Sequence, residues 1–65
     1  MKIIDEGVVK THLDAIKENL DVGFSLMEID LNTEREKHVK AMGMKTTLDD
    51  ISRQVAMIRL YIKED

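Results

Sequence analysis

Apolar residues recur with heptad spacing through both halves of this chain, and no proline interrupts them. In the first half the steps alternate between four and three residues through Val9, Leu13, Ile16, Leu20, Gly23 and Met27. In the second half the same alternation runs through Ala41, Met44, Leu48, Ile51, Val55, Ile58 and Ile62. Because this spacing is typical of helices that pack lengthwise against other helices, the chain is predicted to be all-α.

A short segment separates the two stripes. Thr33 and Glu36 have the spacing of a capping box, which marks the start of a helix, and Asn32 is a residue type that tolerates the left-handed conformation in which helices often end. We therefore predict a helix over about residues 5–30, a turn over 31–33 and a helix over about 34–63. Since a short connection makes consecutive helices antiparallel neighbours, residues 1–65 are predicted to form a single antiparallel hairpin.

Gly43 allows an alternative for the second helix. With the Thr and Asp pairs of residues 46–50 behind it, Gly43 would suit the end of one helix before the cap of the next. The stripe keeps its phase across Gly43, which favours one continuous helix.

The first ten residues also have two interpretations. Ile3-Ile4 and Val8-Val9 flank Asp5-Glu6-Gly7 and would suit short extended pieces. The expected state is a frayed first turn, because Gly7 weakens any helix that includes it.

Chain length and surface pattern together predict self-association. A chain of 65 residues is short for a self-sufficient core, and it has no cysteine for disulfides or thiolate metal sites. Beside the first stripe runs a second one, through Val8, His12, Ala15, Asn19, Val22, Leu26 and Ile29. The combined arc is wider than one neighbouring helix can cover. We therefore expect two hairpins to pair as a dimeric four-helix bundle.

The function that this pattern favours is protein–protein interaction. A small helical module of this kind would act as an adaptor, an inhibitor or a chaperone-like regulator. Large apolar and aromatic side chains dominate such contacts. The candidate interface residues are Phe24, Leu26, Ile29, Met57, Leu60 and Tyr61.

Charge is spread unevenly along the chain. Residues 1–33 hold three basic and seven acidic residues, whereas residues 34–65 hold seven basic and six acidic ones. Asp14, Asp21 and Glu28 recur every seven residues on one edge of the first helix, where a solvated face is expected. Basic residues beside an apolar seam usually pair with acids on neighbouring helices. The alternative is contact with nucleic-acid phosphates, through Arg35, Lys37, Lys40, Lys45 and Arg59.

In architecture alone, the predicted dimeric hairpin resembles the small plasmid-encoded RNA-binding proteins of the Rop type. The resemblance implies an RNA ligand, but no motif is shared, so no residue roles are transferred. A net charge of −3 and a scarcity of aromatic residues for base stacking argue against nucleic acid as the partner.

Motifs that carry chemistry are absent from the sequence. There is no cysteine nucleophile, no glycine-rich phosphate loop and no Gly-x-Ser-x-Gly turn. The two histidines, His12 and His38, do not follow the Glu-x-x-His spacing of di-metal helical bundles. We therefore expect neither catalysis nor a metal or cofactor. No apolar run approaches the length of a membrane span or a secretory signal, which with the lack of cysteine predicts a cytoplasmic protein.

Overall fold

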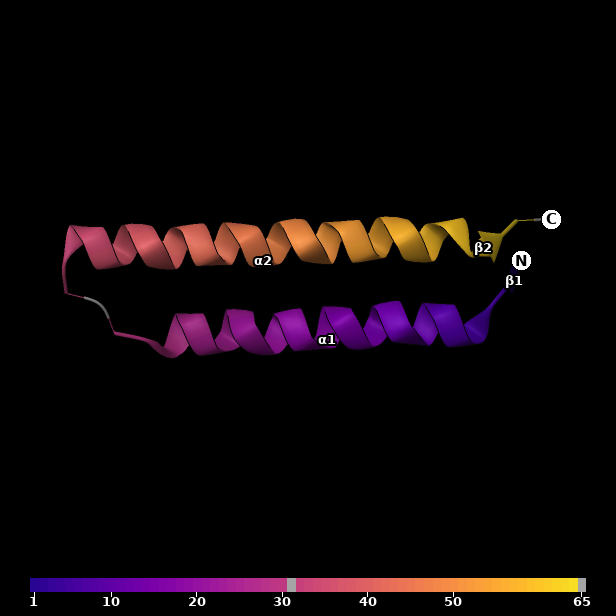
Figure 1. Ribbon diagram of the computed structural model, residues 1–65, viewed down its shortest axis with the longest axis horizontal. Helices are drawn as coiled ribbons and strands as arrows, with labels where there is room; N and C mark the ends of the chain where they lie inside the picture. Colours follow the sequence, from indigo (N-terminus) through magenta and orange to yellow (C-terminus); the bar gives the residue numbers. More distant parts are fainter. Residues whose placement is uncertain (31, 65) are drawn as a thin grey trace.

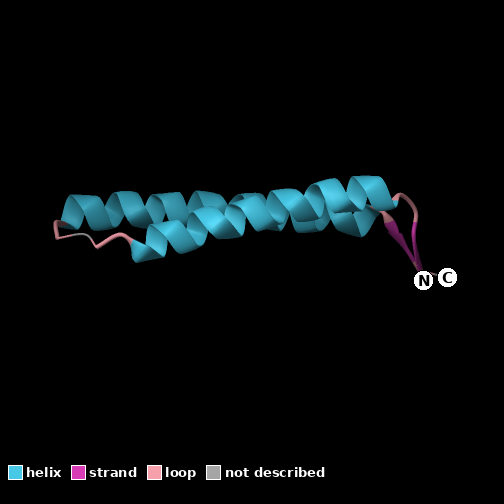
Figure 2. Cartoon of the chain, turned by 90° about the horizontal axis from the view of Figure 1, so that it is seen from below, coloured by secondary structure: helices cyan, strands magenta, loops and turns pink. Residues whose placement is uncertain are grey.

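A computed structural model describes residues 1–30 and 32–64 as an antiparallel hairpin of two long helices (Figure 1). Helix α1 spans Glu6–Glu28 and helix α2 spans Glu34–Leu60. Strands β1 (Lys2–Ile3) and β2 (Ile62–Lys63) pair at the end where the two termini meet. The molecule is a thin rod of 52 × 14 × 13 Å (Figure 2). The predicted all-α hairpin is confirmed.

Both helices begin at a side-chain cap. The Asp5 carboxylate accepts a hydrogen bond of 3.1 Å from the Val8 N–H at the start of α1. The Thr33 hydroxyl accepts one of 3.1 Å from the Glu36 N–H at the start of α2. Since a capping oxygen satisfies an N–H that has no partner within the helix, these bonds fix where each helix starts, and the predicted role of Thr33 is confirmed.

The end of α1 is capped from the other helix. The chain leaves α1 at Glu28, and Ile29 is already extended with φ −75° and ψ 122°. The Lys40 ammonium of α2 donates to the Met27 and Ile29 carbonyl oxygens, at 3.3 and 3.0 Å. The last turn of α1 has no basic residue of its own, so Lys40 supplies the positive charge that a helix C-terminus favours.

The turn differs in detail from the prediction. No described residue has a positive φ, so Asn32 does not adopt the left-handed conformation expected of it. The end of α1 is secured by Lys40 instead. The part of the predicted turn that falls on Leu31 lies outside the described residues.

Helix α2 continues without a break through Gly43, as the phase of its stripe predicted. Gly43 faces the other helix, where a Cβ atom built on it would lie 3.3 Å from Leu26 Cδ1.

The two chain ends pair as a short two-stranded antiparallel sheet. Lys2 pairs with Lys63 and Ile3 with Ile62, and the Ile4 N–H donates to the Tyr61 carbonyl oxygen at 2.8 Å. The prediction of a frayed first turn is therefore wrong, and α2 ends three residues before the predicted position. The hairpin brings the two ends together, and their backbone groups then satisfy one another.

Small residues separate the two helices. Gly23 and Thr47 are buried in the seam, with Ala15 and Gly43 half-buried beside them. Among the described residues Val9 is the only hydrophobic residue that is buried. Small side chains let two helices approach closely, and many of the large apolar side chains remain exposed on the flanks of the seam.

Candidate interaction face

Large hydrophobic side chains remain exposed along both helices. Six of them, five on the predicted heptad stripes and Phe24 beside them, are 38–67% exposed. They are Leu13, Leu20, Phe24 and Met27 on α1, and Leu48 and Val55 on α2. We call this set the apolar face.

A groove in the middle of the apolar face shows that both helices contribute to the same side of the molecule. This open groove has a volume of about 160 Å³ and is lined almost entirely by apolar atoms. Its lining residues are Asn19, Leu20, Gly23, Phe24, Met27, Met44, Thr47, Leu48 and Ile51. Leu13 lies seven residues before Leu20, and Val55 seven after Leu48, so both extend the same face beyond the groove.

The predicted stripes are therefore only in part the contact between α1 and α2. On α1 the contact uses His12, Ala15 and Asn19 of the second stripe and Gly23 of the first, which are half-buried or buried. Leu13 on the first stripe is instead 52% exposed. The apolar arc of α1 is wider than α2 covers, as the sequence predicted, and the uncovered part carries the larger side chains.

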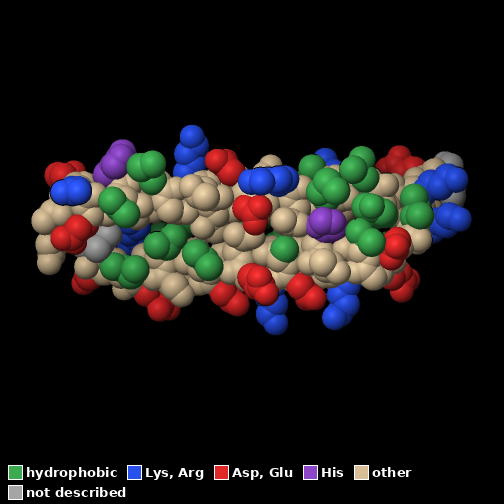
Figure 3. Space-filling model, in the orientation of Figure 1, with side chains coloured by type: hydrophobic (Ala, Val, Ile, Leu, Met, Phe, Trp, Pro, Cys, Tyr) green, Lys and Arg blue, Asp and Glu red, His purple; other side chains and the backbone are tan. Residues whose placement is uncertain are grey.

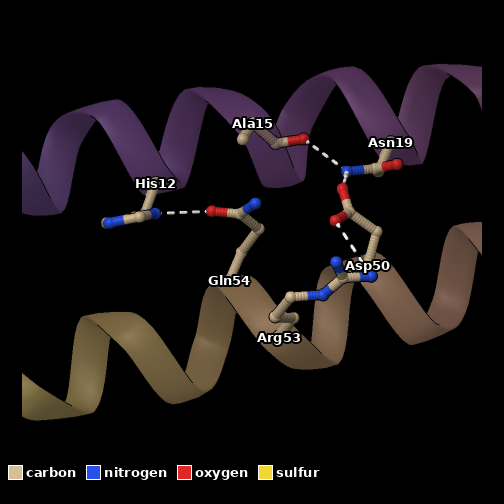
Figure 4. A network of polar contacts seen from close by, with 6 residues as sticks. All are labelled: His12, Ala15, Asn19, Asp50, Arg53 and Gln54. Atoms are coloured by element: carbon tan, nitrogen blue, oxygen red, sulfur yellow. Dashed lines mark hydrogen bonds and ion pairs between the residues drawn. The ribbon is translucent and has the colours of Figure 1, made fainter.

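Polar pairs join the two helices beside the apolar face (Figure 4). His12 Nδ1 lies 2.5 Å from Gln54 Oε1, and Asn19 Nδ2 donates to Asp50 Oδ2. His12 precedes Leu13 by one residue, as Asn19 precedes Leu20. Because one residue turns a helix by about 100°, these polar side chains point to a different side of α1 from Leu13 and Leu20, and Asn19 lies at the edge of the apolar groove.

The side that carries the polar pairs has a mixed surface. Figure 3 shows both histidines on this side and acidic side chains gathered along the edge formed by α1. One of these acids, Asp14, pairs with Lys10 across 3.8 Å, and both are well exposed. The two sides of the hairpin thus differ: one carries the apolar face and the other mixes charged, polar and apolar groups.

The predicted interface residues do not form one surface. Phe24 lies on the apolar face, and Leu26 and Ile29 line an open recess near the turn. Met57, Leu60 and Tyr61 lie at the opposite end of the hairpin, near the termini. The prediction missed the exposed residues that share a face with Phe24: Leu13, Leu20, Met27, Leu48 and Val55. The heptad spacing already contained these residues, but they were assigned to the contact between the helices.

The basic residues of α2 do not form a single basic face either. Lys40 is engaged with carbonyl oxygens of α1, and Lys37 lies 3.4 Å from Glu34. Arg35 and Lys37 are two residues apart, so their side chains point about 200° apart around the helix. Lys45 and Arg59 are exposed further along α2.

Comparison with protein-family models, with curated proteins and with solved structures gives no match. Within residues 1–30 and 32–64, no cluster of three His, Asp or Glu side chains is arranged to hold a metal ion. In the same residues, neither helix combines the length and the hydropathy that crossing a membrane requires.

Proposed function

We propose that this hairpin is a protein–protein interaction module whose apolar face binds a second copy of the chain. The observation that carries the proposal is the apolar face itself, with Phe24 67% and Met27 63% exposed beside an apolar groove. Monomeric proteins rarely leave a continuous hydrophobic surface of this kind uncovered, and such surfaces mark binding sites.

The exposed area of the hairpin supports pairing. The chain exposes 5385 Å², whereas a compact folded chain of its mass is expected to expose about 4,200 Å². The surplus is about 1,200 Å², and a stable interface typically covers about 800 Å² on each partner. A second hairpin on the apolar face would cover an area of this size.

The proposed activity is binding rather than catalysis. The grooves along the described residues are open to solvent, which suits another protein's side chains better than the enclosure of a small substrate. A paired hairpin would present its outer surfaces to a third protein. It would then act as an adaptor, an inhibitor or a chaperone-like regulator by occupying that protein's surface.

Sedimentation equilibrium across a roughly hundredfold range of micromolar concentration tests the pairing. We expect twice the chain mass for the natural protein. Leu48→Glu should give the mass of one chain, because it places a carboxylate in the middle of the contact, where desolvation is costly. Leu48 is 56% exposed in the single hairpin, so the substitution buries no charge within the hairpin itself.

Met42→Glu is the matched control. Met42 is on the same helix and 57% exposed, but it does not line the apolar groove. The Met42→Glu variant should remain a dimer. A natural protein with the mass of one chain and cooperative unfolding would overturn the proposal, and equal dissociation by both variants would show that the apolar face is not the contact.

A further inference from the structure

Two hairpins that cover each other's apolar faces with twofold symmetry can be arranged in two ways. With the symmetry axis along the helices, both turns lie at the same end and α1 of each copy contacts α2 of the other. With the axis across the helices, the turns lie at opposite ends and each helix contacts its own counterpart. We infer that the turns lie at the same end, an inference that rests on the self-pairing proposed above.

The charges of the two helices favour this arrangement. Helix α1 carries five acidic and two basic residues, whereas α2 carries six basic and four acidic ones. With the turns at the same end, the acidic helix of each copy lies against the basic helix of the other. With the turns at opposite ends, acidic lies against acidic and basic against basic. Electrostatic complementarity of this kind selects orientation in helical assemblies.

The register of the hairpin favours the same arrangement. Asn19 is bonded to Asp50 and Gly23 lies against Thr47, so these residues are level along the rod. An axis along the helices keeps the same levels between copies. The exposed stripe of α1 then faces the stripe of the other copy's α2 to within about one residue. The facing pairs are Leu13 with Val55, Leu20 with Leu48, and Met27 with Ala41.

Charged residues at the border of the apolar face also match. At these levels, each acid of the heptad row on α1 comes within about one helical turn of a basic residue of the other copy. The pairs are Asp14 with Arg59, Asp21 with Lys45, and Glu28 with Lys37. Lys10 also comes level with Arg59 of the other copy, and these two positive charges repel each other. Asp14, whose carboxylate lies 3.8 Å from the Lys10 ammonium, offsets that repulsion.

The opposite arrangement loses these matches. With the helices fully overlapped and the turns at opposite ends, Lys37 of one copy comes within about one turn of Arg59 of the other. The basic border of α2 then faces itself, and the acidic row of α1 faces a helix that carries only two basic residues, Lys10 and Lys17, against five acidic ones.

A spin-label distance between the two turns decides the arrangement. The chain has no cysteine, so Asn32→Cys gives one attachment site per chain, at an exposed position in the turn. Neighbouring helices in a bundle lie about 10 Å apart. Turns at the same end should therefore give a distance below about 30 Å, with the label tethers included. Turns at opposite ends should give a distance near the 52 Å length of the hairpin.

A mixed dimer provides the control. When one copy is labelled at Asn32→Cys and the other at Glu64→Cys, the same-end arrangement should give the long distance and the opposite arrangement the short one. A dimer with a long distance between the Asn32 labels would overturn the inferred arrangement and leave the pairing intact. The mass of one chain, with no coupling between labels on different chains, would overturn both.

Discussion

At the scale of single residues, the contact between the helices is set by polar side chains as much as by apolar ones. Asn19 Nδ2 donates to the Ala15 carbonyl oxygen at 2.9 Å and to Asp50 Oδ2 at 2.5 Å. Arg53 lies 3.7 Å from the other oxygen of Asp50. An apolar stripe tolerates sliding by one turn, whereas a hydrogen-bonded pair is satisfied at one position only. The Asn19–Asp50 pair therefore specifies how α1 and α2 align.

This role predicts an energetic coupling between Asn19 and Asp50. In a double-mutant cycle with Asn19→Ala and Asp50→Ala, we expect a coupling free energy of about 1 kcal/mol in urea unfolding, because each side chain loses its partner when the other is truncated. Asp49 is the control, since it is the exposed neighbour of Asp50 and, in the described part of the chain, has no hydrogen bond to α1. A cycle of Asn19→Ala with Asp49→Ala should give a coupling near zero. Equal couplings in the two cycles would contradict the prediction.

At the scale of the helices, Gly23 and Gly43 lie where α1 and α2 approach each other. Neither has a positive φ, so neither is required for backbone conformation. A Cβ atom on Gly23 would lie 3.7 Å from Met44 Sδ and 3.8 Å from Thr47 Cγ2, which are ordinary contacts. A Cβ atom on Gly43 would lie 3.3 Å from Leu26 Cδ1, which requires that side chain to shift.

The two alanine variants should consequently differ. We expect Gly23→Ala to raise the free energy of unfolding by about 1 kcal/mol, the usual gain in helix propensity. Gly43→Ala should raise it by less, about 0.5 kcal/mol, because Leu26 must move toward the open recess that it lines. Urea unfolding of both variants measures the difference. A loss of stability for Gly23→Ala, or a larger gain for Gly43→Ala, would show that the spacing of the helices differs from that described.

The sequence could predict the helices, but not which residues of each stripe contact the other helix and which remain exposed. Heptad spacing and the Thr33 cap are local properties, and they gave the hairpin, its direction and the continuity through Gly43. The choice of seam depends on which part of the arc on α1 lets another helix approach most closely, and the small residues Ala15 and Gly23 decide that. For the N-terminus the sequence offered a short extended piece at Ile3-Ile4 only as an alternative, and the pairing with the C-terminus could not be predicted because it forms only once the hairpin has brought the chain ends together.

At the scale of the whole molecule, the hairpin is too thin to enclose a core. Its radius of gyration is 15.4 Å, against about 11 Å for a compact domain of this length. Val9 is the only hydrophobic residue buried among those described. Burial of apolar area is the main favourable term in folding and must offset a large loss of conformational entropy. Folding of this chain is therefore expected to depend on pairing.

Coupled folding and pairing predict a melting temperature that rises with protein concentration. A hundredfold increase in concentration should stabilise the paired state by about 2.7 kcal/mol. For a dimer of this size that corresponds to an increase on the order of 10 °C in melting temperature. Differential scanning calorimetry of the natural protein at both ends of the range measures it. A melting temperature that does not change with concentration would mean that the single hairpin is the folding unit.

The variant Leu20→Ala tests whether the stabilisation by pairing comes from the apolar face. Leu20 is 46% exposed in the single hairpin, so its truncation would cost less than about 1 kcal/mol if that were the native state. In the proposed paired state Leu20 would be covered by the other copy, and the expected cost is about 2–4 kcal/mol, as for other buried leucines. Ser25→Ala, at an exposed position of the same helix, should change stability by less than about 0.5 kcal/mol. The large loss for Leu20 is expected only if the second copy covers it, so a loss as small as that of Ser25→Ala would place the apolar face in solvent and remove the basis for pairing.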